Sequence, residues 1–133
     1  MLELALHYGA GPIALKSIAT KQHISLKYLE QIIMQLSKAG LVESVRGAQG
    51  GYRLACRPDQ VTVGTILTAL EGNLTPSECT DAYFECPSSG DCVAQGVWVK
   101  IKQAIDEVVD HIYLADLVRE HEQKNAGCIQ APQ

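Results

Sequence analysis

The fold is decided by residues 15–54, which read LKSIATKQHISLKYLEQIIMQLSKAGLVESVRGAQGGYRL. Residues 15–22 are predicted to form one helix, and Ser25 is a good N-cap for a second. In each helix the apolar residues recur at the helical period and share one face, which must be buried. They are Leu15, Ile18 and Ala19 in the first helix and Leu29, Ile32, Ile33 and Leu36 in the second. Two helices joined by so short a turn predict a helix-turn-helix unit.

A predicted β-hairpin follows the second helix. The sequence Ala39–Leu41 ends that helix, residues 41–45 are rich in strand formers, and residues 52–54 resume a strand. The turn between the strands contains three glycines, which let its tip follow a phosphate backbone closely. A hairpin behind a reading helix is a wing, so the sequence predicts a winged helix-turn-helix that binds double-stranded DNA.

The polar face of the second helix and the tip of the hairpin supply candidate DNA contacts. Gln31 can pair with an adenine edge, Lys27 with guanine or phosphate, and Glu30 can accept from cytosine. Arg46 supplies charge or a minor-groove probe, and Gln49 adds a neutral hydrogen bonder. An ordinary helical hairpin with solvated polar residues is the alternative. The predicted DNA-binding residues are Ser25, Lys27, Tyr28, Glu30, Gln31, Arg46, Gly47, Gln49 and Gly50.

Charge is distributed unevenly along the chain. The 133 residues carry a net charge of −4, but residues 1–60 hold seven Lys and Arg against four acids, a net of +3. Residues 61–133 carry a net charge of −7. This division predicts a DNA-binding domain at 1–60 followed by a sensory and dimerisation region at 61–133, although two ordinary solvated surfaces are the alternative. The absence of long apolar runs and of a signal-like N-terminus predicts a cytoplasmic protein without a membrane partner.

Three of the five cysteines lie in a short polar stretch at about residues 75–92, namely Cys79, Cys86 and Cys92. Its Pro, Ser and Gly residues predict a loop. Thiolates are soft ligands suited to iron-sulfur clusters or zinc, and this spacing is too wide for the paired cysteines of structural zinc sites. The loop is therefore a candidate metal site, with free thiols, zinc and a redox disulfide as alternatives. Cys56 and Cys128 are interpreted as bystanders.

A long helix is predicted from Val93 onward. Its apolar seam recurs at intervals of three and four, at Trp98, Ile101, Ile105, Val108 and Ile112. The seam packs either on the winged domain or on the same helix of a second copy. We expect the second arrangement, a homodimer that presents two reading domains to a palindromic operator. Residues 114–118 are predicted to form a short closing helix, residues 2–8 another helix, and the tail from Glu120 a loose polar segment.

Much of the chain resembles the Rrf2 family of winged-helix transcription regulators. The resemblance is carried by Ile24–Gln31, Lys38–Val42, Ser44–Gly47, Gly50–Tyr52, Thr62–Gly64, Leu70–Gly72, the later cysteines and Leu114–Leu117. It implies a mainly α fold with a small β wing, in which the winged helix-turn-helix is followed by a long dimerisation helix. The iron-sulfur regulators of the IscR type are the nearest group, and the nitric-oxide sensors of the NsrR type are the nearest alternative.

The same resemblance implies a 2Fe-2S or 4Fe-4S cluster at the three loop cysteines. IscR-like members take a fourth ligand from a histidine at the position of Gln95. NsrR-like members use an acid of the partner subunit, in a segment that precedes the position of Met1 in family members. The fourth ligand in this chain is therefore unassigned. In IscR-like relatives the glutamate matching Glu30 helps to decide which operators the cluster-free form accepts.

Two other functions are alternatives. A regulator of the same fold could sense nitric oxide, redox state or a metabolite without a stable cluster. A cluster-based electron carrier is a further alternative, but it has no need of a helix-turn-helix and wing. No enzyme is expected, because the sequence contains neither a recognisable nucleophile–base pair nor a glycine-rich phosphate loop between a strand and a helix.

Overall fold

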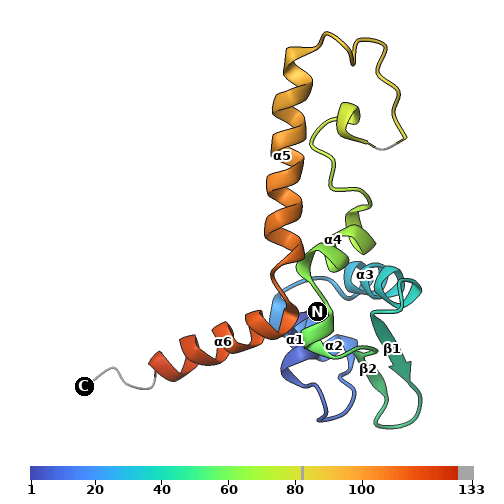
Figure 1. Cartoon of the computed structure of the whole chain (residues 1–133). Helices are drawn as coiled ribbons and strands as arrows, with labels where there is room; N and C mark the ends of the chain where they lie inside the picture. The colour runs from blue at the N-terminus through green and yellow to red at the C-terminus, as the bar shows by residue number, and fades with distance from the viewer. Residues whose placement is uncertain (82, 129–133) are drawn as a thin grey trace.

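The computed structural model describes residues 1–81 and 83–128 (Figure 1). The chain is mainly helical with a two-stranded antiparallel wing, which confirms the expected fold class. The elements are α1 (Leu2–Leu6), α2 (Leu15–Gln22), α3 (Leu26–Lys38), β1 (Val42–Val45), β2 (Gly51–Leu54), the 3-10 turn η1 (Pro58–Gln60), α4 (Val63–Glu71), the 3-10 turn η2 (Glu78–Thr80), α5 (Val93–Asp110) and α6 (Leu114–Cys128).

Helices α2 and α3 form the predicted helix-turn-helix. His23 ends α2 in the left-handed conformation (φ 54°), which a non-glycine residue adopts at a cost of about 1 kcal/mol and which turns the chain sharply. Ser25 caps α3, since its Oγ accepts a hydrogen bond of 3.1 Å from the Tyr28 backbone N–H. The predicted apolar face of α3 is confirmed: Leu29, Ile33 and Leu36 are buried and Ile32 is half-buried.

The wing is fixed to the body of the domain at its base. Strand β2 pairs with β1, and the backbone of Tyr52 also exchanges two hydrogen bonds of 2.9 Å with Ile13, just before α2. Gly51 is required at this point, because a Cβ atom there would collide with the Ile13 carbonyl group. The base of the hairpin is therefore rigidly attached, while the tip extends beyond it.

One hydrophobic core joins the two halves of the chain. Its most deeply buried side chains are Leu36 of α3, Val61 and Leu114, the first residue of α6. Two backbone hydrogen bonds of 2.8 Å reinforce this junction, from the Leu114 N–H to the Val61 carbonyl and from the Val63 N–H to the Ile112 carbonyl. Residues on both sides of residue 60 thus share the core, and the division into two domains at that point stays a prediction.

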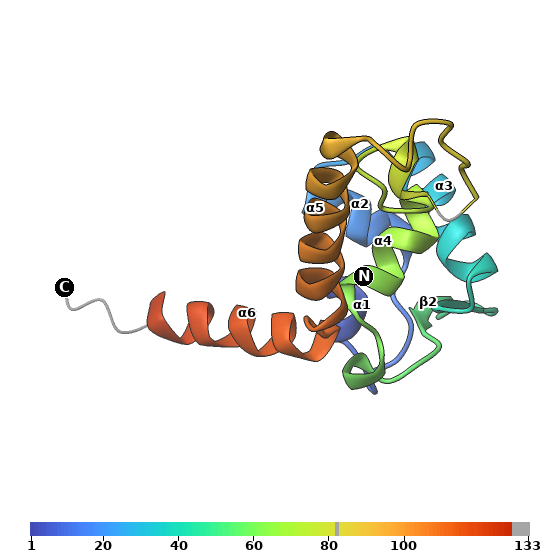
Figure 2. The ribbon, with the colours of Figure 1, turned by 45° about the horizontal axis from the view of Figure 1, so that its top comes forward.

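Helices α5 and α6 extend from this core in different directions. Helix α5 carries the cysteine loop at its far end, and α6 projects away from the body in both views (Figures 1 and 2). The long helix predicted from Val93 is confirmed, but it ends at Asp110, so Ile112 lies in the connection to α6. Within residues 1–81 and 83–128, no helix is both long enough and apolar enough to cross a membrane.

The end of the chain differs most from expectation. Helix α6 continues through Glu120 to Cys128, so the predicted short helix and loose tail were wrong over residues 114–128, and residues 129–133 lie outside the described residues. Polar contacts one turn apart support the longer helix, including a 2.6 Å ion pair between Lys124 and Glu120. The Lys124 ammonium group lowers the pKa of the Glu120 carboxyl group.

Two further helices differ from the predictions. Helix α4 was not predicted, although Thr62 caps it by accepting a 3.1 Å hydrogen bond from the Thr65 N–H. Helix α1 is shorter than the predicted 2–8, because it ends before a turn at Gly9 (φ 82°).

We expect Leu114→Ala to reduce the free energy of unfolding of the winged domain by about 2–5 kcal/mol, because the substitution leaves a cavity in the shared core. Gln123→Ala, on the exposed part of the same helix, is the control and should change stability by less than about 0.5 kcal/mol. Chemical denaturation monitored at Trp98 and by circular dichroism measures both. A Leu114→Ala variant as stable as the native chain would contradict the shared core.

Candidate nucleic-acid interface and cysteine loop

The predicted DNA-binding residues occupy two neighbouring elements. Helix α3 packs against β1, so the wing lies beside α3. All of the predicted contacts on α3 are exposed, and so are those of the wing tip except Gly50, which is half-buried. The residues on α3 are Ser25 at its cap, Lys27, Tyr28, Glu30 and Gln31, and those on the wing are Arg46, Gly47, Gln49 and Gly50.

The tip of the wing is a tight turn. The Gly50 N–H donates a 3.0 Å hydrogen bond to the Gly47 carbonyl, and Gly47 has a φ of 117° that favours glycine. A Cβ atom at Gly50 would collide with the Val45 carbonyl. The turn leaves the Arg46 side chain exposed, so its guanidinium group can reach a ligand beyond the tip.

Salt bridges divide the basic residues of the first half into two groups. Three of them are paired: Lys21 with the buried Glu3 at 2.9 Å, and two arginines with exposed acids, Arg53–Glu43 and Arg57–Asp59. Within the described residues the other four make no salt bridge, namely Lys16, Lys27, Lys38 and Arg46. These four lie on the helix-turn-helix and the wing, so positive charge that is free to meet phosphates is concentrated there.

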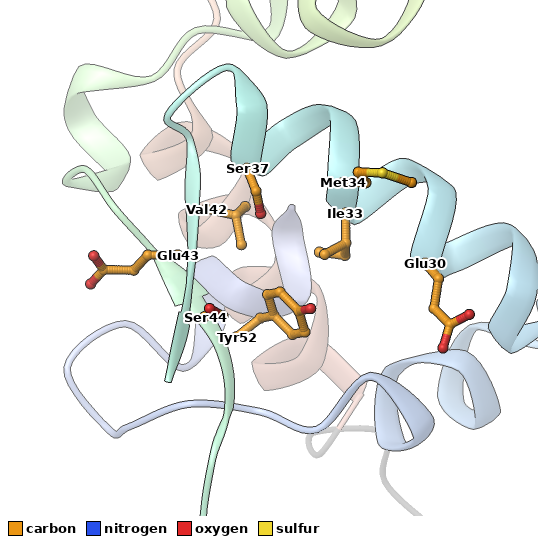
Figure 3. Close-up of a pocket in the computed structure, with 8 residues that line it drawn as sticks. All are labelled: Glu30, Ile33, Met34, Ser37, Val42, Glu43, Ser44 and Tyr52. Atoms are coloured by element: carbon orange, nitrogen blue, oxygen red, sulfur yellow. The ribbon is translucent and has the colours of Figure 1, made fainter. Parts of the chain in front are cut away.

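A groove separates α3 from the wing (Figure 3). We call it the helix–wing groove, and it is lined by Glu30, Ile33, Met34, Ser37, Val42, Glu43, Ser44 and Tyr52. Apart from Glu30, sequence reasoning did not select these residues as contacts. The exposed Met34 on the otherwise polar face of α3 was the available signal, whereas Tyr52 reaches the groove only because β2 pairs with β1, the strand that packs against α3.

The three loop cysteines lie between η2 and the start of α5. Cys79 is in η2, half-buried, with its Sγ 3.0 Å from the Ser77 hydroxyl. Cys86 is half-buried, and Cys92 is the exposed N-cap of α5, where its side chain makes no capping bond. Consecutive turns connect the last two, since the Cys92 N–H donates to the Ser88 carbonyl at 3.1 Å. Cys86 and Cys92 are therefore joined to the N-terminal end of α5, and η2, which carries Cys79, packs against the same helix.

The loop does not gather these thiols into a formed metal site. In the part of the chain that the structure describes, no group of three or more Cys, His, Asp or Glu side chains is placed to hold a metal ion. Gln95 is half-buried on the first turn of α5. Three thiols on one loop still fit an iron-sulfur cluster in their donor chemistry, although the loop must close to bring them together.

The remaining candidates do not join the cysteine loop. Cys56 is half-buried at the end of the wing, with its Sγ 3.9 Å from the Gly40 carbonyl. The side chain of Cys128 lies outside the described residues. His111 is exposed beyond α5, and its ring Nδ1 lies 2.7 Å from the Glu107 carbonyl oxygen.

Part of the predicted seam of α5 is open to solvent. Val108 and Ile101 of that seam are exposed, Val108 by 58%, and so is Val97, which the predicted seam did not include and which is 57% exposed. Ile105 is half-buried on a helix that packs against α4 and η2 of the same chain. The apolar surface of α5 thus divides into a side covered within the chain and an uncovered stripe, which we call the α5 stripe and define as Val97, Ile101 and Val108.

Residues 1–120 match the Rrf2 family, which is described as an iron-dependent transcriptional regulator. The chain is 44% identical over 117 residues to the regulator CymR of Bacillus subtilis (strain 168), covering 88% of this chain and 80% of that protein. It is 38% identical over 122 residues to the regulator IscR of Aliivibrio salmonicida (strain LFI1238), covering 92% and 72%.

Solved structures agree with these relatives. IscR of T. potens superposes with a TM-score of 0.76 at 45% identity, covering 99% of this chain and 83% of that one. CymR, titled the global cysteine regulator of B. subtilis, superposes with a TM-score of 0.73 at 41% identity, covering 90% and 87%. These relatives are named as transcriptional regulators, which is a role without catalysis. The chain belongs to the Rrf2 family of transcriptional regulators.

Proposed function

We propose that this chain is a sequence-specific, DNA-binding regulator of bacterial transcription that recognises its operator with α3 and the wing. The observation that carries the proposal is the exposed polar face of α3 beside a wing tip, on a helix-turn-helix and wing that carry four basic residues without a salt bridge in the described part of the chain. Chromosomal DNA as the ligand implies a cytoplasmic location, which belongs to the same proposal.

The chemistry of the two elements assigns them different tasks. With α3 in the major groove, the Gln31 amide can pair with adenine and the Glu30 carboxylate can accept from cytosine while repelling base acceptors. Lys27, near the N-terminus of the helix, reaches guanine or phosphate. Arg46 at the wing tip reaches the phosphate backbone or the minor groove, and the tight glycine turn lets the backbone come close.

We expect Arg46→Ala to weaken binding to all duplexes and to reduce the slope of log K against log salt by about 1, because one phosphate contact is lost. Gln31→Ala should cost about 1–3 kcal/mol at one base position, because it removes a base contact. Arg57→Ala is the control, since Arg57 is an exposed arginine already paired with Asp59. Fluorescence anisotropy on duplexes selected from a random library measures all three. Unchanged affinity in both Arg46→Ala and Gln31→Ala would refute the assigned surface.

A homodimer is the second part of the proposal. The α5 stripe leaves apolar side chains in water along one side of an 18-residue helix. Burial of such a stripe against a copy of itself would stabilise a two-fold dimer. Two reading domains would then face a palindromic operator and roughly double the phosphate contacts.

We expect Ile101→Glu to yield a monomer, because a carboxylate in the centre of the α5 stripe would be buried without a partner. The salt slope of DNA binding should fall by roughly half as one reading domain is lost. Gln103→Glu introduces the same charge at an exposed position of α5 outside the stripe and should leave the dimer intact. Analytical ultracentrifugation measures the oligomeric state of both variants. A dimeric Ile101→Glu variant would exclude the stripe as the interface.

Control by an iron-sulfur cluster is the third part of the proposal. Cys79, Cys86 and Cys92 would hold it, and the fourth ligand is unassigned. When bound, the cluster would supply a redox- and oxygen-sensitive link between the three thiols. Cys92 would transmit closure of the loop directly to α5, because it is the N-cap of that helix.

The chain provides a continuous physical connection from α5 to the reading helix. The C-terminal end of α5 leads into Ile112, whose carbonyl accepts from the Val63 N–H at the start of α4, and α4 packs against α3. A change in the loop could bias the reading domains through this route. A typical coupling of about 1–3 kcal/mol corresponds to a 5- to 150-fold change in operator affinity.

We expect the anaerobically purified and reconstituted chain to contain iron with sulfide-to-iron charge-transfer absorbance and a cluster Mössbauer spectrum. Alanine at any one of the three loop cysteines should lower the iron content sharply, because a ligand is lost. Cys56→Ala is the matched control and should retain the iron, since Cys56 lies at the base of the wing. A native chain without iron after reconstitution would refute the cluster while leaving the DNA-binding proposal intact.

A cluster-free sensor of nitric oxide, redox state or a metabolite is the second candidate. The separate placement of the three thiols in this structure favours it, together with the relative titled as a cysteine regulator. In this case Cys86 and Cys92 could form a reversible disulfide, because consecutive turns of the chain connect them. Mass spectrometry of the iron-free chain after mild oxidation distinguishes the two candidates.

A further inference from the structure

The helix–wing groove opens between the two elements that are proposed to contact DNA. Ile33 of α3 and the ring of Tyr52 of β2 face each other across it, while Glu43 points to the opposite side of the wing (Figure 3). Glu43 is also neutralised by Arg53 at 2.6 Å. Glu30 is thus the lining acid on the α3 side whose charge is not paired within the described residues.

Hydroxyl groups line this groove from both sides. Ser37 comes from α3, and Ser44 and Tyr52 come from directly paired positions of β1 and β2. None of these three hydroxyls makes a hydrogen bond within residues 1–81 and 83–128. A hydroxyl donates a proton and carries no charge, so it can meet a phosphate oxygen without the repulsion that Glu30 exerts.

Tyr52 is the best positioned of the three. Its backbone is held by Ile13 on one side and by β1 on the other, and its ring is half-buried against the core. The phenol therefore has little freedom to lose when it binds a partner. Met34 is 66% exposed on the α3 side of the same groove, where a large apolar side chain has no partner in the core.

The geometry of duplex DNA determines what can enter this groove. The major and minor grooves of B-DNA are separated by a single sugar–phosphate backbone. If α3 lies in the major groove and the tip of the wing lies in or over the adjacent minor groove, one backbone must cross the space between them. Phosphate suits the hydroxyls of this groove, and deoxyribose suits the exposed Met34 thioether.

We propose that the helix–wing groove seats one DNA backbone segment and that the Tyr52 hydroxyl donates a hydrogen bond to one of its phosphates. This inference rests on the proposed function and deepens it, since it adds a neutral phosphate contact at the base of the wing to the charged contact at its tip. Glu30 then stands beside the backbone as well as the bases, so it opposes any operator that brings a phosphate closer.

The charge of the donor gives the contact a distinctive signature. Arg46 replaces a counterion on the DNA, so its loss changes the salt slope, whereas a tyrosine hydroxyl replaces none. Loss of the Tyr52 hydroxyl should weaken binding at every salt concentration by the same factor. A hydrogen bond to a charged group predicts a factor of about ten or more.

The test uses the full chain and a duplex that the native protein selects from a random-sequence library. Tyr52→Phe removes one oxygen and keeps the ring, and Tyr113→Phe is the control, because Tyr113 lies at the junction of α5 and α6. Thermal denaturation verifies that both variants fold. We expect about tenfold weaker binding for Tyr52→Phe with an unchanged salt slope, and unchanged binding for Tyr113→Phe.

A phosphate scan locates the partner atom. Methylphosphonate is introduced at one phosphate of the duplex at a time, and each duplex is titrated with the native chain and with Tyr52→Phe. At one position per half-site the neutral linkage should weaken DNA binding by the native chain but weaken binding by Tyr52→Phe much less. Such non-additive effects show that the Tyr52 hydroxyl and that phosphate interact directly.

The outcomes separate the two levels of proposal. A native chain that selects no duplex overturns both the proposed DNA recognition and the proposed phosphate contact in the helix–wing groove. If the native chain binds tightly and Tyr52→Phe binds equally well, only the proposed phosphate contact in the helix–wing groove is overturned. The same holds if the Tyr52→Phe substitution and the methylphosphonates act independently at every phosphate. If Tyr52→Phe does not fold, Ser44→Ala at the paired strand position takes its place in the scan, and independent effects at every phosphate again overturn the proposed contact.

Discussion

Burial of Leu114 in the core of the winged domain is the constraint on which the arrangement of the chain depends. The residue lies at the start of α6, yet it is only 1% exposed and belongs to the same core as Leu36 and Val61. Backbone hydrogen bonds at Leu114 and at Ile112 keep the connection between α5 and α6 against residues 61–63. From this anchored junction α5 leaves the core and carries the cysteine loop at its far end (Figure 1).

The reading surface depends on the same core from the other side. Leu29, Ile33 and Leu36 hold α3 by its apolar face, so its polar face points to solvent whichever rotamers the polar side chains adopt. The two hydrogen bonds between Ile13 and Tyr52 set the position of the wing beside it. Helix α3 and the wing are therefore preorganised with respect to each other, which would lower the entropy cost of the proposed binding to DNA.

Local signals account for the parts that were predicted well. The helical period and the Ser25 cap predicted α2 and α3, and the glycine turn between two strand-forming runs predicted the wing. Helix α4 lacked such contrast, since its mixture of Val, Thr, Ile and Leu also suits a strand, and its packing against α3 and α5 decides its form. The tail from Glu120 looked unstructured because contacts between polar residues one turn apart contribute little individually.

The sequence by itself determined the helix-turn-helix, the wing, the uneven distribution of charge and the family, because each depends on residues that are close in the chain. Only the tertiary structure decided which basic residues are paired, which side of α5 is left uncovered and which residues face the helix–wing groove. Lys21 forms an ion pair with the buried Glu3, eighteen residues away, and Tyr52 faces Ile33 across the groove between the wing and α3. Such pairings arise when distant segments pack around one core, and no local pattern records them.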